Sequence, residues 1–170
     1  NMDGFFKVMG IVDACSRPDG DADPDSAWIH VPLKNDKSTQ LYWRKMKNPK
    51  KVEFQFHTII DAPLGDVMCN CAEVDTWDAW NKMVKKCQLI DSHKYGVNFC
   101  LHFGKWLTFS VAATVCRFID PKNGFVLEYS YSQTWPDVEQ DGIKLNLSSY
   151  QILIPTTNAQ GKSVTMLVHF

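Results

Sequence analysis

The chain has 170 residues, the size of one ordinary domain, and a chain of this length buries about 70% of the surface that it exposes when unfolded. Hydrophobic residues at 45% and charged residues at 22% are near the globular average, which excludes a disordered tail, a collagen-like fibre and a disulfide-stapled miniprotein. Eighteen basic residues against nineteen acidic ones leave a net charge of -1, so the chain has no global attraction for nucleic acid.

Aromatic residues make up 12% of the chain, which indicates that a large apolar volume is packed. The uncharged run of residues 106–116 is about half as long as a membrane-spanning helix. The six cysteines lie mostly among apolar neighbours and lack the CxxC pairs of a zinc site. No secretory signal opens the chain, and its first residue is Asn1 rather than Met. We therefore expect a cytoplasmic domain over residues 1–170, cut from a longer protein, with reduced thiols, no metal and no cofactor.

The first third of the chain predicts a helix, a hairpin and a strand. Apolar residues recur at helical spacing over residues 4–14, which indicates an amphipathic helix. The β-prone runs 28–31 and 40–43 predict a hairpin, and the alternation of apolar and polar side chains over 52–60 predicts a half-buried strand. The basic run 44–51 has the charge to meet anionic lipid headgroups, but a solvated turn between two strands is the favoured interpretation.

A helix is expected directly after this strand, because Pro63 stands near its first turn and an apolar face runs from Leu64 to Cys71. The Trp-rich segment 74–81 then forms a corner. We expect Trp80 to pack at the end of the helix and to anchor this corner to the sheet.

The rest of the chain predicts three antiparallel hairpins separated by turn residues. They pair residues 86–92 with 97–103, residues 106–119 with 125–132, and residues 143–154 with 162–170. One early helix pair inside a long antiparallel meander predicts the α+β class.

Four stretches of the chain match, in order, the parts of a known domain family. They are a short tyrosine-containing strand at 40–43, a small-Pro step into a helix at 56–63, Trp80-Asn81 ahead of the basic strand 84–91, and a closing hairpin made of 150–155 and 161–168. Over about residues 28–170 the sequence therefore resembles a START domain, the steroidogenic-acute-regulatory-related lipid-transfer family. The resemblance implies a helix-grip fold, in which a curved antiparallel sheet carries an N-terminal helix and short helices after the strand that ends near Ile60.

The resemblance also implies a function, namely the binding and intermembrane transfer of a sterol, phospholipid or fatty acid in an internal tunnel. Such a domain needs no catalysis and makes transient contact with membrane surfaces. Two parts of the family pattern are missing here: Phe-Ser-Val-Ala-Ala at 109–113 replaces an Arg-Asp pair on the central strand, and the chain ends before the C-terminal helix that roofs the tunnel. We expect the apolar face to be covered by a ligand, by the N-terminal helix, or by self-association of the fragment.

The central strand from Trp106 has two unlike faces, one of bulky aliphatic residues and one of small, weakly polar residues. One hypothesis is that the small residues line an open tunnel while the bulky face packs against the N-terminal helix; the other is that small residues only make room for a bulky neighbour. The candidate ligand-binding residues are Phe99, Leu101, Trp106, Thr108, Ser110, Thr114, Tyr129 and Tyr150.

Two other classes of function stay open at this point. A helix-grip enzyme of the cyclase or dehydratase type would use His57 or His102 as general base, although nothing in the sequence brings either one to a nucleophile. A ligand-free interaction module would fill its own cavity with side chains. Glu128 could be a buried charge partner for Arg117 or Lys144, but a side chain that faces solvent is the favoured interpretation, because carboxylates are seldom buried.

Overall fold

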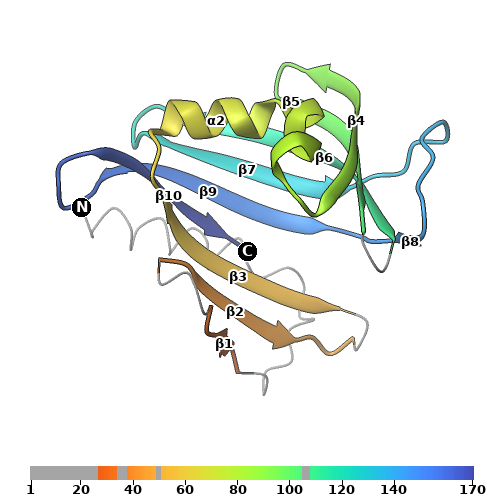
Figure 1. Ribbon diagram of the computed structural model, residues 1–170, viewed down its shortest axis with the longest axis horizontal. Helices are drawn as coiled ribbons and strands as arrows, with labels where there is room; N and C mark the ends of the chain where they lie inside the picture. The colour runs from red at the N-terminus through yellow and green to blue at the C-terminus, as the bar shows by residue number, and fades with distance from the viewer. Residues whose placement is uncertain (1–26, 34–37, 49–50, 105–107) are drawn as a thin grey trace. The chain divides into compact units, whose positions relative to one another are not determined.

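The computed structural model describes residues 27–33, 38–48, 51–104 and 108–170. They form two units, one made of the residues up to Ile59 together with Val168–Phe170, and the other of Ile60–Leu167. The helix expected over residues 4–14 lies outside the described residues. The class is α+β, as predicted, with an antiparallel sheet and short helices (Figure 1).

The first unit contains three antiparallel strands, β1 (Ile29–Val31), β2 (Gln40–Lys45) and most of β3 (Val52–Ile60). The predicted hairpin and the predicted strand are both confirmed. Alternation places Trp43 opposite Phe54 on one face, while Arg44 pairs with Glu53 on the other. Near the end of the chain, His169 stacks on Phe56 with ring centroids 4.6 Å apart.

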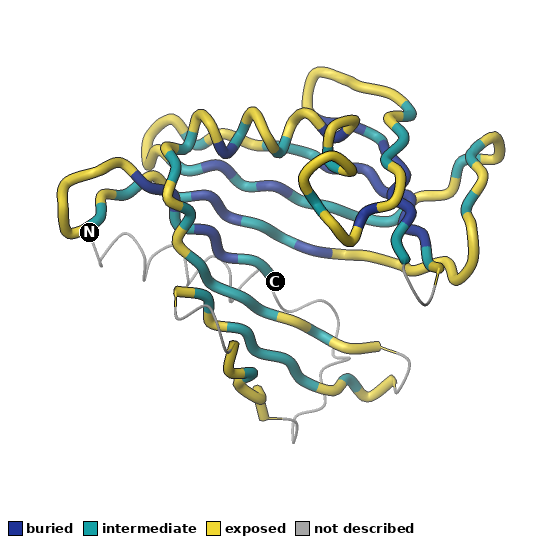
Figure 2. The backbone as a smooth tube through the Cα atoms, in the orientation of Figure 1, coloured by how far each residue is buried: buried dark blue, intermediate teal, exposed yellow. Residues whose placement is uncertain are grey.

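The second unit is built on a sheet with the strand order β10-β9-β7-β6-β5-β4. Its strands are β4 (Val84–His93), β5 (Gly96–Phe103), β6 (Phe109–Asp120), β7 (Phe125–Ser132), β8 (Ile143–Lys144), β9 (Ser148–Thr157) and most of β10 (Ser163–His169). Buried positions follow the central strands of this sheet, and exposed positions follow the turns (Figure 2). The first two predicted hairpins are confirmed, apart from small differences at their ends.

The single strand predicted over 143–154 is wrong, because the chain breaks between β8 and β9. Strand β7 ends opposite Ala113 and leaves the beginning of β6 without a neighbour on that edge. Strand β8 takes this place and pairs with β6 in parallel. The amide of Ile143 donates to the Thr108 carbonyl at 3.1 Å, which satisfies backbone groups that β7 does not reach.

Three short helical segments follow β3: α2 (Leu64–Ala72), the 3-10 turn η1 (Val74–Thr76) and α3 (Trp77–Trp80). Pro63 starts α2, since its φ of -65° already suits a helix and its missing N–H costs no hydrogen bond there. Val67 is buried, as the predicted apolar face requires. The Thr165 hydroxyl donates to the Ala62 carbonyl at 2.9 Å and ties the start of α2 to β10.

The core of the second unit lies between these helices and the sheet. It joins Val74, Val84, Val97, Phe99, Leu101, Val111, Ala113 and Val115, and Trp77 packs against it. The bulky face of β6 packs in one cluster with Val74 and Trp77, and the N-terminal helix expected against this face lies outside the described residues. The predicted anchor is also wrong by one helical turn, because Trp80 is 55% exposed while Trp77 makes the contacts with the core.

Candidate functional site

The register of β5 and β6 divides their side chains between two faces. Phe99 lies opposite Ala113, and Leu101 opposite Val111, on the face covered by the helices. His102 lies opposite Ser110 on the other face. Because side chains alternate along a strand, odd- and even-numbered residues of β6 can meet a ligand only on opposite faces of the sheet.

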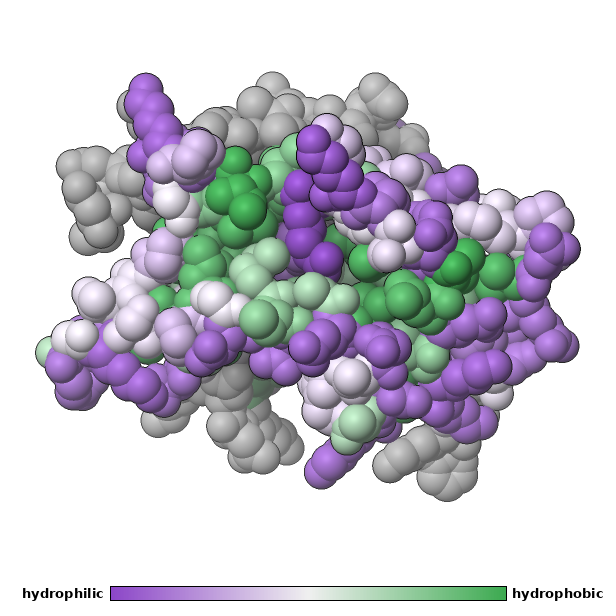
Figure 3. Space-filling model, turned by 90° about the horizontal axis from the view of Figure 1, so that it is seen from above, coloured by the Kyte–Doolittle hydropathy of each residue, from purple (hydrophilic) through white to green (hydrophobic). Residues whose placement is uncertain are grey.

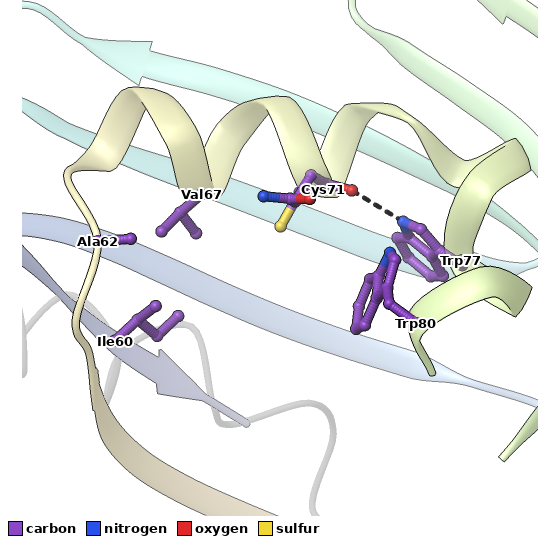
Figure 4. A pocket seen from close by; sticks show the side chains of 7 residues that line it. Ile60, Ala62, Val67, Cys71, Trp77 and Trp80 are labelled. Atoms are coloured by element: carbon purple, nitrogen blue, oxygen red, sulfur yellow. Dashed lines mark hydrogen bonds between the residues drawn. The ribbon is translucent and has the colours of Figure 1, made fainter. Parts of the chain in front are cut away.

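A pocket of about 200 Å³ opens on the helix-covered side (Figure 4). Its walls are Ile60, Ala62, Val67, Asn70, Cys71, Trp77 and Trp80, so the end of β3, helix α2 and helix α3 all contribute. The side-chain amide of Asn70 donates to the Asp66 carbonyl at 3.0 Å. The remaining walls are apolar apart from one thiol.

Trp77 holds the two helices together at one end of the pocket. Its indole N–H donates to the Asn70 carbonyl at 3.0 Å, and its ring lies 5.4 Å from that of Phe99. Trp80 meets Trp77 edge-on, with ring centroids 6.3 Å apart and planes inclined at 62°. Figure 4 shows both rings directed toward the space below α2. Trp77 is thus part of the core, and Trp80 is a wall that also meets solvent.

A buried ion pair lies beneath the end of α2. Arg117 on β6 donates through Nε to Glu128 on β7, and the two side chains are 15% and 7% exposed. The second carboxylate oxygen of Glu128 accepts from Gln151 Nε2 at 2.9 Å, and Arg117 Nη2 donates to the Cys71 carbonyl at 2.6 Å. The expectation that Glu128 faces solvent is therefore wrong. Arg117 lies on the same strand, β6, as the stretch where an Arg-Asp pair is missing, and its pair with Glu128 on β7 ties α2 to the sheet.

Burial raises the pKa of the Cys71 thiol to about 11; the charge of Glu128 adds to this shift and that of Arg117 opposes it. The thiol is therefore neutral near pH 7, and it contributes an uncharged surface to the pocket. Among the described residues, no group of three or more His, Cys, Asp or Glu side chains is placed to hold a metal ion.

The opposite face carries a different polar arrangement. Cys100 Sγ lies 3.5 Å from His102 Nε2, and His102 Nδ1 lies 3.4 Å from Asp141 Oδ2 without hydrogen-bond geometry. Ser110 is fully buried, and its hydroxyl has no hydrogen-bond partner among the residues that the structure describes. Burial raises the pKa of Cys100, which keeps its thiol protonated and unlike an activated nucleophile. His57, the other histidine considered, is paired with Gln55 at 2.9 Å, and burial lowers its pKa.

The eight candidate ligand-binding residues are not brought together. Phe99 and Leu101 are in the core on the helix-covered face. On the opposite face lie Ser110, Thr114, Tyr129 and Tyr150, where Tyr129 stacks on Tyr150 at 4.7 Å. Thr108 is exposed and precedes β6, and Trp106 lies outside the described residues. The two groups face away from each other and cannot line one cavity.

Sequence reasoning missed most of the pocket walls, which come from α2 and α3 rather than from the long strands. The apolar face of residues 64–71 and the two tryptophans of the corner carried the signal, because both features mark a surface that packs against something. Among the described residues, no helix is long and apolar enough to cross a membrane.

No family model matches this chain, and no curated protein matches it either. Solved structures do match. A fragment of the STAR-related lipid transfer protein from Xanthomonas axonopodis aligns with a TM-score of 0.64 at 12% identity, over 83% of this chain and 80% of its own. The human StAR-related lipid transfer protein 5 aligns with a TM-score of 0.69 at 9% identity, over 99% and 79%.

The lipid transfer and protein localization domain of human StarD13 gives a TM-score of 0.66 at 11% identity, over 95% of this chain and 80% of its own. This chain has a START-like fold. The helix-grip class expected from the sequence is thereby confirmed. At such low identity the START-like likeness concerns the fold alone, so ligand and activity must be argued from the site.

Proposed function

We propose that this START-like domain binds an apolar lipid group in the pocket beneath α2 and transfers the lipid between membranes. The observation that carries the proposal is an apolar pocket, walled by two tryptophans and a neutral thiol, in a fold shared with lipid transfer proteins. Removing apolar surface from water supplies about 25 cal/mol per Å². Binding of this kind needs no covalent chemistry, and we propose no enzymatic activity.

The size of the pocket limits what it holds as it stands. Pockets for small molecules are about 300 to 1,000 Å³, and this one is about 200 Å³. We propose that it receives one end of a lipid, an acyl segment or a ring, and that it widens when the Trp80 side chain rotates outward. Trp80 is more than half exposed at the end of α3, so little packing opposes this rotation, whereas Trp77 stays packed against the core.

The pocket offers no free charge to select a headgroup, which leaves a sterol, a phospholipid and a fatty acid as ligand classes. Of the candidate residues, Phe99 and Leu101 lie on the correct face, and we propose that they back the pocket behind Trp77. A ligand role for Ser110, Thr114, Tyr129 and Tyr150 would require a second site on the opposite face. The proposed setting is the cytoplasm, with transient contact at membrane surfaces.

A direct test blocks the pocket without altering the surface charge. The Ala62→Leu variant places a larger side chain in the pocket wall, and the Ala72→Leu variant makes the same change at an exposed position outside it. We expect brominated fatty acid to quench the tryptophan fluorescence of the wild-type chain and of Ala72→Leu, and to bind Ala62→Leu at least tenfold more weakly. Equal melting temperatures for the two variants would exclude unfolding as the cause.

Equal affinity of both variants for the fatty acid would contradict the assigned pocket. Absence of uptake by the wild type, tested also with a fluorescent sterol and a phospholipid, would favour a ligand-free interaction module instead.

A further inference from the structure

We infer that the turn from Trp80 to Lys86, defined here as the docking turn, is the surface through which this domain rests on an anionic lipid bilayer. The inference rests on the proposed lipid function, because it assigns the membrane contact to one named surface beside the pocket. It starts from the two large apolar side chains of this turn.

Trp80 is 55% exposed and Met83 is 68% exposed. The turn between them is tight, since the Asn81 side chain accepts from the Met83 amide at 3.1 Å and the Asn81 carbonyl accepts from the Val84 amide at 2.9 Å. Val84 is buried and fixes the turn to the core. The apolar tips are therefore presented from a rigid base rather than from a loose loop.

The same turn carries three exposed lysines, Lys82, Lys85 and Lys86. A register shift between Val84 and Lys86 gives Lys85 no partner on β5 and leaves both lysines at the surface. None of the three forms an ion pair with another residue that the structure describes. Lys82 and Lys85 lie in the turn with the two apolar tips, and Lys86 projects from the other face of the edge strand β4, opposite His102. Together these cations and apolar tips complement a surface with an apolar interior and anionic headgroups.

Acidic residues precede the docking turn in the sequence. Asp75 and Asp78 are exposed, and their charges add to burial in raising the pKa of Cys87 to about 12, which places both carboxylates close to that strand. Their charges weaken the attraction to an anionic surface. From the side of α2 and α3, apolar patches bordered by hydrophilic side chains are visible in the space-filling view (Figure 3).

The expected gain in affinity for anionic vesicles follows from the number of lysines in the docking turn. One lysine near an anionic bilayer contributes roughly a fivefold factor to the binding constant, so three contribute on the order of 100-fold at low ionic strength. Salt at about 0.5 M screens most of this factor. Removing the Asp78 charge should strengthen binding by a few fold.

The test is co-sedimentation of the full chain with vesicles of phosphatidylcholine containing about one third phosphatidylserine. We expect binding by the wild type, a loss of about 100-fold in Lys82→Gln/Lys85→Gln/Lys86→Gln, and a gain in Asp78→Asn. The matched control, Lys94→Gln/Lys122→Gln/Lys144→Gln, removes the same charge at exposed positions elsewhere and should bind as the wild type does. Pure phosphatidylcholine vesicles should bind weakly.

A second variant tests the apolar tips. Met83→Ser leaves the pocket walls unchanged, so we expect about tenfold weaker binding to vesicles with unaltered uptake of free fatty acid. Equal losses of vesicle binding in the two triple variants, or full vesicle binding by Met83→Ser, would overturn the assignment of the docking turn as the membrane-binding surface. Failure of fatty acid uptake together with intact vesicle binding would instead overturn the proposed lipid function and leave the docking surface standing.

Discussion

The buried ion pair between Arg117 and Glu128 makes the sharpest stability prediction. Replacing Glu128 with Ala removes the acceptor of both Arg117 Nε and Gln151 Nε2. It leaves a guanidinium group that is only 15% exposed without its counter-charge. Breaking a buried pair from one side costs about 3 to 5 kcal/mol, which is a large part of the 5 to 15 kcal/mol that stabilises a typical domain.

Removing both partners should cost far less than the sum of the single changes. In Arg117→Met/Glu128→Leu no charge stays buried, and apolar replacement of such pairs is often neutral or stabilising. Two hydrogen bonds are still lost. The donor to the Cys71 carbonyl is worth about 1 to 3 kcal/mol if that carbonyl finds no water, and the acceptor of Gln151 Nε2 is worth less because Gln151 is only half-buried and water can replace it. We therefore expect the double variant to be destabilised by about 3 kcal/mol at most, against roughly 6 to 10 kcal/mol for two additive single changes.

Urea unfolding followed by circular dichroism measures the four corners of the double-mutant cycle, namely the wild type, Arg117→Met, Glu128→Leu and the double variant, with Glu128→Ala as a fifth sample. The control is the pair of Lys162 with Asp61, whose atoms are 2.8 Å apart but whose side chains are 56% and 73% exposed. Asp61→Ala should cost under about 1 kcal/mol, because solvent already screens that pair. A Glu128→Ala cost as small as that of the control, or additive single changes, would refute a buried and coupled pair.

Three further predictions follow from single positions. Trp77→Ala should lower the free energy of unfolding by about 3 to 5 kcal/mol and Trp80→Ala by under about 2 kcal/mol, since only Trp77 packs against the core. A larger loss in Trp80→Ala than in Trp77→Ala, measured by thermal or urea unfolding, would contradict the assignment of Trp77 as the anchor. Burial lowers the pKa of His169 to about 4, so below pH 6.5 the unfolded chain gains a proton that the folded chain does not. Because of His169, the free energy of unfolding should fall by on the order of 3 kcal/mol between pH 7 and pH 4. The His169→Phe variant should lose this part of the pH dependence, so the difference between the two chains measures the contribution of His169. Gly96→Ala should destabilise by about 3 kcal/mol or more, because the added Cβ would overlap the Val115 backbone, and a variant with an unchanged melting temperature would show that the two strands separate easily.

The strands and the helix at Leu64–Ala72 could be predicted because each depends on local pattern. Alternation over 52–60 and the turn residues between later runs are properties of neighbouring residues, and the structure reproduces them. The break between β8 and β9 could not be predicted in this way. It follows from the length of a different strand, β7, which stops opposite Ala113.

The site was harder to predict than the fold for the same physical reason. Burial of Glu128 depends on Arg117, which only the register of β6 and β7 places opposite it. Trp77 and Trp80 stand one turn apart on a four-residue helix, so their spacing does not say which of them reaches Phe99. The alternation of side chains along β6 correctly predicted which residues share the small face and which share the bulky face. It does not tell which of the two faces the helices cover.

The central claim is that one lipid occupies the pocket beneath α2, and native mass spectrometry of the chain expressed in cells tests it most directly. The account predicts a one-to-one complex with a lipid-sized mass for the wild type and for Ala72→Leu, and the bare chain for Ala62→Leu. A wild-type chain that carries no lipid, and gains no mass after incubation with a fatty acid, a sterol and a phospholipid, would contradict it.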